Sequence, residues 1–395
     1  MKTNILKITG ILLSMLAAWS VLPSLSAARD SSIQDRVTNK PSDDKTVDQA
    51  FKNIKVLNGM PQSKLYPTMR FMATSLGFQC GSCHIIKNGF IDAPADDKPE
   101  KQTARQMIKM VIEINKTLFQ GEPIVSCYTC HRSHHTPEGV PTLPLPTPSP
   151  RLSIGTPPTR SSTPESAIPS ADEVLNKYLI AIGGKAATDR ITNCVVKGTT
   201  TTAIGQVVAY QAETVAPDKG HETFAIQDVP VRSCAGDSRC EYERVINGRQ
   251  GWLKSGAGVQ ELVGEQLADQ RLSFPLFQIL KLKDQYASFR FGGPEKIDDR
   301  DVYVVSAVRS DQKLERLYFD RENGLLRRRI SYLRSLVGTI PQQTDFEDYR
   351  EVNGLRLPFT ITMAFADPGS RPITRKFAEI KVNLPVAPST FDKPQ

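Results

Sequence analysis

The sequence contains the same short pattern, Cys-x-x-Cys-His, at two places. The first copy lies in FQCGSCHIIK, residues 78–87, and the second lies in VSCYTCHRSH, residues 126–135. Each copy supplies two thiols and one imidazole in a fixed order, and few kinds of site use these groups together. The repeat therefore limits what this part of the chain can fold around.

The first residues of the chain have the pattern of a secretory signal. Lys2 and Lys7 form a basic start, an apolar run follows from Ile11 to Leu22, and small residues surround Ala28. We expect residues 1–28 to be removed as a signal peptide and the mature protein to be periplasmic. An uncleaved anchor with peripheral membrane association is the alternative, although the run is short for a bilayer span of about 20 residues.

Cys-x-x-Cys-His is the attachment motif of c-type haem, in which both thiols bond to the haem and the histidine binds the iron. Two copies behind a signal peptide favour this interpretation, because the attachment takes place outside the cytoplasm. We therefore expect two covalently bound haem c groups. The attachment residues are Cys80, Cys83, Cys127 and Cys130, and the iron ligands are His84 and His131.

Two other sites use paired cysteines. A zinc site could use the four thiolates, but it would leave both histidines without a role. A thioredoxin-like redox pair needs a βαβ setting, and the sequence around the motifs shows none. Covalent haem is the interpretation that uses every residue of the repeat.

A segment with helical periodicity precedes the first motif. In LYPTMRFMATSLG, the residues Leu65, Met69, Met72 and Leu76 fall on one face, and Gly77 is a natural helix stop. A methionine on an apolar helical face usually packs in a core. Here a haem is expected after the helix, so we expect one methionine to be the sixth iron ligand and the other to pack.

A second such segment, TARQMIKMVIEINKTLFQG, precedes the second motif. Thr103 and Gln106 fit a capping box, and Gly121 is placed to end the helix. The apolar positions with helical spacing are Met107, Met110, Val111, Ile114 and Leu118. Residues 53–135 thus contain one unit twice, a helix with Met-x-x-Met followed by a turn and the motif. Spacing alone leaves open which methionine of each pair is the ligand.

Residues 53–135 resemble the cytochrome c subunit of photosynthetic reaction centres. The resemblance rests on TMRFMATSLGFQCGSCH and on ARQMIKMVIEINKTLF followed by VSCYTCHR. In that family the helix before each motif supplies the sixth ligand. The resemblance implies that Met69 lies opposite His84 and that Met107 lies opposite His131. Met72 would then be a packing residue, as would the second methionine of the later helix, Met110.

The chain also departs from that family. Photosynthetic members carry four haems, whereas this sequence has two motifs, and no histidine stands late in the second helix. The family's CHRG is CHRSHH here, so Ser133 replaces glycine. We expect His134 and His135 to lie exposed after the motif. The alternative is that one of them replaces Met107 or binds the iron of the other haem. The resemblance covers about a fifth of the chain and favours a dihaem electron carrier over a photosynthetic role.

Ten prolines lie within residues 136–170, so this stretch predicts an extended linker rather than a packed core. It separates a mainly α dihaem domain at 53–135 from a domain at 171–395. Because few contacts cross an extended tether, we expect the two domains to fold independently.

The second domain predicts a helix followed by antiparallel strands. Ala171 to Ile182 has helical periodicity, with Ser170 as N-cap and Gly183-Gly184 as the stop. From Cys194 onward, runs such as DVYVVSAV and LPFTITMAF alternate with period two. Asn-Gly pairs at 247–248, 323–324 and 353–354 separate several of these runs.

Residues 171–395 resemble the curved antiparallel sheet, or half-open barrel, of bacterial lipoprotein carriers. The resemblance rests on YLIAIGGKAA, ERLYFDRENGLLRR, DFEDYREVNGLRLPFTI and IKVNLPVAPSTFDKP. It implies an α+β domain that binds a hydrophobic ligand or a lipoprotein. A docking module without a ligand is the alternative. We expect the arginine run 327–329 to lie on a solvated strand edge.

These features predict an exported electron carrier with redox partner proteins in the cell envelope. No Ser-His-Asp pattern is present, so we do not expect an enzyme. A net charge of +8 without a dense basic run also argues against nucleic acid as a partner. Two alternatives stay open: a dihaem peroxidase with one open iron position, and a lipid- or lipoprotein-binding protein with accessory haems.

Overall fold

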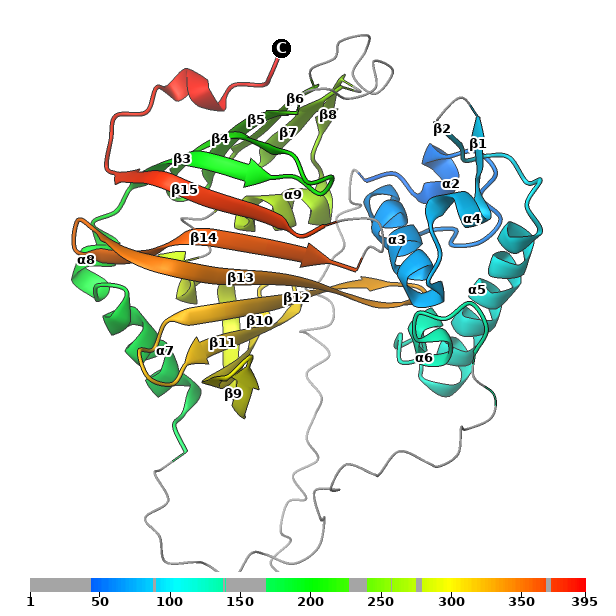
Figure 1. Cartoon of the computed structure of the whole chain (residues 1–395), viewed down its shortest axis with the longest axis horizontal. Coiled ribbons are helices and arrows are strands. Elements are labelled where there is room, and N and C mark those ends of the chain that lie inside the picture. The colour runs from blue at the N-terminus through cyan, green and yellow to red at the C-terminus, as the bar shows by residue number, and fades with distance from the viewer. Residues whose placement is uncertain are drawn as a thin grey trace, which may run out of the picture. The chain divides into compact units, whose positions relative to one another are not determined.

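The computed structural model describes residues 44–87, 90–137, 139, 168–226, 240–256, 258–274, 279–366 and 371–395. The expected signal peptide and most of the proline-rich linker lie outside these ranges. The described residues belong to one compact unit, in which helices come first and a large sheet follows (Figure 1). Among the described helices, none is long and apolar enough to cross a membrane.

The N-terminal part contains the predicted long helix twice, and a short helix that the sequence did not predict follows each of them. The repeated elements are α3 (Leu65–Leu76), α4 (Cys80–Cys83), α5 (Pro99–Leu118) and α6 (Cys127–His131). The smaller elements are α2 (Val47–Ala50), a 3-10 turn (Gln62–Lys64), β1 (Ile85–Lys87) and β2 (Phe90–Asp92). Each short helix α4 and α6 contains one Cys-x-x-Cys motif.

The ends of the two long helices test the capping predictions. The predicted stop of α3 at Gly77 is confirmed, since this residue is the C-cap with a φ of 67°. The predicted capping box of α5 at Thr103 is wrong. This helix begins at Pro99, whose fixed φ suits the first helical position. The Thr103 hydroxyl therefore lies inside the helix and donates to the Pro99 carbonyl at 3.2 Å.

The C-terminal part is a 13-stranded sheet in which every neighbouring pair is antiparallel. Its order is β8-β7-β6-β5-β4-β3-β15-β14-β13-β12-β11-β10-β9. The strands are β3 (Asn193–Thr201), β4 (Val207–Val215), β5 (Lys219–Ile226), β6 (Cys240–Asn247), β7 (Gln250–Ser255), β8 (Gly258–Glu261), β9 (Tyr286–Ile297), β10 (Arg300–Arg309), β11 (Leu314–Asp320), β12 (Leu326–Ser335), β13 (Gly338–Val352), β14 (Leu355–Phe365) and β15 (Ile373–Val382). The predicted Asn-Gly turns join β6 to β7, β11 to β12 and β13 to β14.

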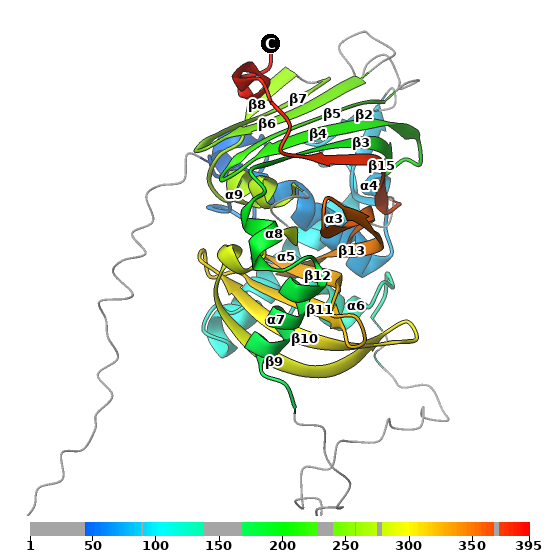
Figure 2. The same ribbon diagram turned by 90° about the vertical axis from the view of Figure 1, so that its left-hand side faces the viewer.

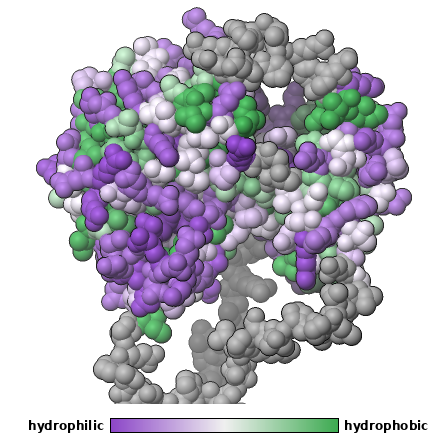
Figure 3. Space-filling view, viewed as in Figure 1, coloured by the Kyte–Doolittle hydropathy of each residue, from purple (hydrophilic) through white to green (hydrophobic). Residues whose placement is uncertain are grey.

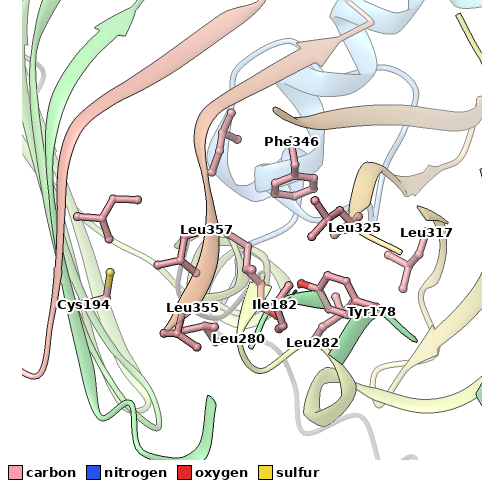
Figure 4. Packing of buried hydrophobic residues seen from close by; sticks show 14 of the residues in the cluster. Tyr178, Ile182, Cys194, Leu280, Leu282, Leu317, Leu325, Phe346, Leu355 and Leu357 are labelled. Carbon is pink, nitrogen blue, oxygen red and sulfur yellow. Dashed lines mark hydrogen bonds between the residues drawn. The ribbon is translucent and has the colours of Figure 1, made fainter. Parts of the chain in front are cut away.

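The sheet curves, and helices lie within the curve. Figure 2 shows α7 (Ala171–Ala181) and α8 (Lys185–Asp189) between two halves of the sheet, with α9 (Gly264–Leu272) deeper inside. The predicted cap of α7 is confirmed, because the Ser170 hydroxyl accepts from the Glu173 N–H at 3.2 Å. Tyr178 and Ile182 belong to a buried cluster with side chains from both halves, including Cys194 of β3 and Leu317 of β11 (Figure 4).

A separate hydrophobic cluster joins the helical part to the sheet. It contains Phe71 of α3 and Ile108 of α5 together with Val337 and Ile340, which lie at the end of the β12–β13 hairpin. This differs from the expectation that few contacts cross between the two parts. A proline-rich tether makes no contacts of its own, but it does not prevent two apolar surfaces from docking.

Candidate haem-binding site

Both motifs fold as single helical turns that their own polar residues cap. Before α4, the Gln79 N–H donates to the Ser82 hydroxyl at 3.4 Å, and before α6 the Ser126 N–H donates to the Thr129 hydroxyl at 3.0 Å. Ser82 and Thr129 each occupy the second x position of their motif. The spacer residues therefore shape the turn, and they leave the cysteines and the histidine available for another group.

The four helices pack crosswise. The helix before the first motif, α3, packs against the second motif helix, α6, while the first motif helix, α4, packs against α5. Each motif thus makes contact with the long helix of the other unit. The two repeated units consequently form one assembly around a shared interior, instead of two separate lobes.

That interior is a cavity of about 770 Å³. This volume lies within the range of about 300–1,000 Å³ that is usual for sites of cofactors and small molecules. Residues of both motifs and of both long helices line it. The predicted ligands and attachment residues among them are Met69, Cys80, Cys83, His84, Met107, Cys127, Cys130 and His131, and the other two helical methionines are Met72 and Met110.

The methionines of α5 are poorly covered by protein. Met107 is 43% exposed and Met110 is 46% exposed, although both lie on a predicted apolar face. The residues that α5 buries are instead Ile108, Val111 and Asn115. Exposed large apolar side chains that line a cavity point to a bound apolar group. On α3, Met69 and Met72 are half-buried and also line the cavity.

The two motif histidines suit an axial role in different ways. Nδ1 of His131 lies 3.1 Å from the carbonyl oxygen of His134, an interaction that orients the ring and leaves Nε2 for a metal. Nδ1 of His84 is buried without a hydrogen-bond partner. Burial lowers the pKa of His84, and the charge of Lys101 acts in the same direction. A neutral imidazole is the form that binds iron.

The four motif cysteines are free thiols in this structure. Burial raises the pKa of Cys127 to about 11 and also raises the pKa of Cys83. A reactive Cys-x-x-Cys pair has a lowered thiol pKa, so the thioredoxin-like alternative loses support. Across the described ranges, no group of three or more His, Cys, Asp or Glu side chains is placed to hold a metal ion.

The loop after the second motif closes against the end of α3. Ser133, where the resembled family has glycine, has a φ of 68°, in the left-handed region that glycine favours. Its N–H donates to the Ser75 carbonyl at 2.9 Å. Its carbonyl oxygen would lie 2.4 Å from a Cβ at Gly77, so Gly77 has to lack a side chain.

The two histidines after the motif are exposed, as the sequence predicts. His135 stacks on Phe78 with 4.8 Å between ring centroids, and both residues line the cavity. Sequence reasoning gave no signal for this pairing, because the two residues are far apart along the chain.

The interior of the sheet contains buried ion pairs that sequence reasoning missed. Glu222 of β5 lies 2.8 Å from an Arg244 nitrogen and 3.0 Å from an Arg375 nitrogen, and the Tyr210 hydroxyl donates to it at 2.9 Å. All four residues are more than nine-tenths buried. Side chains alternate between the two faces of a strand with period two. This pattern does not show whether a charged side chain faces inward or outward, so the sequence did not reveal the buried ion pairs.

A second group of this kind lies on the other half of the sheet. The Glu315 carboxylate accepts a hydrogen bond from the Tyr286 hydroxyl at 2.5 Å and lies 3.6 Å from a nitrogen of Arg309. The guanidinium of Arg309 also contacts acidic residues outside the strand. Arg329 is 3.9 Å from the Glu315 carboxylate. The expected solvated edge for the arginine run is wrong, since β12 lies between β11 and β13 and buries Arg329.

The curve of the sheet, as far as the structure describes it, holds buried hydrophobic side chains. These side chains form the cluster around α7, and the pocket found there has about 200 Å³, between α7 and residues such as Tyr303 and Phe319. Cys194 is buried and free in the same cluster. Cys240 is disulfide-bonded. The sequence predicts a small disulfide loop between Cys240 and Cys234, and Cys234 lies outside the described residues.

The comparisons with known proteins concern both parts of the chain. The family described as photosynthetic reaction centre cytochrome c subunit matches residues 21–221. Cytochrome c-554 of Chloroflexus aurantiacus is 31% identical over 87 residues, and the match spans about a fifth of each protein.

Solved structures resemble the sheet. A LolA superfamily protein from Nitrosomonas europaea has 17% identity and a TM-score of 0.39, and the match covers 57% of this chain and 99% of that one. An outer membrane lipoprotein-sorting protein domain from Vibrio parahaemolyticus has 13% identity and a TM-score of 0.38, with 56% and 95% covered. The family match alone spans more than half of the chain, including both motifs, so this chain belongs to the photosynthetic reaction centre cytochrome c subunit family.

Proposed function

We propose that this chain is an exported dihaem c-type cytochrome that transfers electrons between redox partner proteins in the cell envelope. The observation that carries the proposal is the single cavity that both Cys-x-x-Cys-His motifs and both methionine pairs line. A haem iron held by histidine and methionine supplies one-electron transfer, and methionine raises its reduction potential relative to a second histidine.

The residues have matching roles in the two units. Cys80 and Cys83 would form the thioether bonds of the first haem, and His84 and Met69 would bind its iron. In the second unit Cys127 and Cys130 form the bonds, and His131 and Met107 are the iron ligands. With two protein ligands at each iron, substrate is kept from the metal, which favours an electron carrier over a peroxidase.

The surface around the cavity is suited to short-range contact with a partner. Ile86 and Ile91 of the β1–β2 hairpin are exposed, and Ile91 also lines the cavity. Figure 3 shows hydrophobic surface over this part of the molecule. The sheet, whose described curve holds the buried cluster around α7, is proposed to act as a docking domain, with the binding of a hydrophobic ligand as the alternative.

Haem counting tests the proposal. The mature protein should keep two haems per chain after acid–acetone extraction, measured as the pyridine haemochrome. Replacing Cys80 and Cys83 by alanine should leave one haem. Cys194→Ala, which removes a buried thiol of the sheet, is the matched control and should leave two. Haem that is lost to the solvent from the unaltered protein would contradict the proposed function.

A further inference from the structure

The hairpin between β12 and β13 ends in a two-residue turn, Leu336–Val337, whose conformation is fixed locally. Ser335 pairs with Gly338 across the turn. The Ser335 hydroxyl donates to the Gly338 carbonyl at 3.0 Å and accepts from the Val337 N–H at 3.3 Å. One serine thus bonds to both sides of the turn, so the tip is a rigid feature of the sheet.

The two turn residues have opposite environments. Leu336 is 41% exposed, whereas Val337 is 0% exposed. Val337 packs in the cluster that contains Phe71 of α3 and Ile108 of α5, and Ile340 joins it from β13. A hairpin tip that projected into solvent would expose both turn residues. This tip is therefore inserted into the core of the helical part.

Gly338 makes the closest approach. A Cβ at this position would lie 2.6 Å from the Cβ of Ser126 and 2.9 Å from the ring of Phe71, and the φ of Gly338 is 144°. Ser126 is the N-cap of α6 and directly precedes Cys127. Phe71 lies on α3 two residues after Met69. One backbone position of the sheet therefore touches both the first methionine helix and the second motif helix.

Further contacts hold the same region of the helical part. Lys64, which precedes α3, lies 3.0 Å from Glu265 of α9. The guanidinium of Arg70 on α3 lies 5.7 Å from the ring centroid of Phe365 at the end of β14. The attachment of α3 to the sheet thus involves its start and its middle as well as its contact with the hairpin.

We propose that the β12–β13 hairpin is a positioning element for the cavity, in which Val337 and Gly338 fix the separation of α3 and α6. The element holds Met69 on one wall and the second motif on the other. This inference rests on the proposed function, because it concerns a proposed iron ligand. It gives the sheet a part in electron transfer although the sheet contributes no redox group.

Ligand exchange in the full-length ferric protein tests the inference. Imidazole displaces a methionine ligand at the rate at which the methionine leaves the iron, and loss of the near-infrared sulfur-to-iron band follows the exchange. One phase of the ligand exchange should be absent from Met69→Ala. Val337→Ala should make that phase at least tenfold faster, and it should lower the reduction potential of the same iron. The phase that Met107→Ala abolishes should change less than threefold.

Leu336→Ala is the matched control, since it truncates the exposed neighbour in the same turn, and it should change either phase less than twofold. If Val337→Ala prevents folding, Val337→Thr keeps the side-chain shape and should speed the Met69 phase at least threefold. Unchanged exchange in the valine variant that folds would overturn the inference, as would equal acceleration of both phases. Absence of covalent haem from the unaltered protein would instead overturn the proposed function.

Discussion

Glu222→Gln should destabilise the sheet strongly while it keeps the shape of the side chain. The Glu222 carboxylate lies 2.8 Å from Arg244 and 3.0 Å from Arg375, and the three residues are between 5% and 8% exposed. Two guanidinium groups therefore share one carboxylate out of contact with water. The amide of glutamine would leave both positive charges buried without that counter-charge.

The expected loss is about 3–5 kcal/mol of unfolding free energy, which is typical when one partner of a buried ion pair is removed. A surface pair on β15 gives the comparison. Glu379 lies 2.7 Å from Lys381, and both side chains are about half exposed. Pairs of this kind contribute about 0–1 kcal/mol. Glu379→Gln is therefore the matched control, with the same change of charge and atoms at an exposed position.

Urea unfolding followed by tryptophan fluorescence measures both variants. The chain has two tryptophans, and one of them, Trp19, lies in the expected signal peptide. Trp252 of β7 is buried and reports on the sheet. With a urea dependence of about 2 kcal/mol per M, the midpoint should fall by about 2 M for Glu222→Gln. A shift equal to that of the Glu379 control would refute the reasoning.

The effect of Glu222 should also depend on pH. Burial by itself raises the pKa of this carboxyl, but Arg244 and Arg375 outweigh it, so the pKa lies below its ordinary value. Its stabilisation is then complete above the unfolded pKa of about 4.3 and is lost as the pH falls through the lower folded pKa. The difference between the unaltered protein and the glutamine variant should stay constant from pH 8 to about pH 5 and shrink in more acidic solution.

Two further predictions concern the cavity and the loop that closes against it. Alanine in place of a proposed ligand should open one ferrous iron to carbon monoxide, measured in the visible spectrum, whereas alanine in place of a packing methionine should not. The ligand pair is Met69 and Met107, and the packing pair is Met72 and Met110. Gly77→Ala should cost at least about 1–2 kcal/mol in thermal unfolding, because its φ of 67° is strained for alanine and the Ser133 carbonyl oxygen would lie 2.4 Å from the new Cβ. Gly121 has a φ of 83° but open space around a Cβ. Gly121→Ala therefore introduces the backbone strain without the collision, and it should destabilise the protein less than Gly77→Ala.

The features that the sequence predicted are those that a few neighbouring residues determine. The stop of α3 at Gly77, the cap of α7 at Ser170 and the Asn-Gly turns all depend on local backbone preferences. The start of α5 was misplaced because two local signals competed. Thr103 fits a capping pattern, but Pro99 earlier in the segment is equally suited to begin a helix, and the helix takes the earlier start.

The buried face of α5 shows a limit of hydrophobic periodicity. Met107, Met110 and Leu118 follow helical spacing, yet all three are exposed to 43% or more, and the helix packs through Ile108 and Val111. Periodicity identifies apolar positions without identifying what covers them. A face that packs on protein and a face that lines a cavity for an apolar group have the same pattern, so the cavity became visible only in three dimensions.

The contact between the sheet and the helical part depends on pairings far apart in the sequence, and the proline-rich linker suggested its absence. One local signal was nevertheless present. Tight hairpin turns favour glycine, asparagine and aspartate, whereas the turn Ser335-Leu336-Val337-Gly338 places two large apolar residues at the tip. Apolar residues at such a position are unfavourable in water, so the turn itself indicates a covering surface. Phe71 and Ile108 supply that surface, and a chain ending after the second motif would expose both. Every expected haem ligand lies in the helical part, yet the hydrophobic core of that part includes side chains of the sheet.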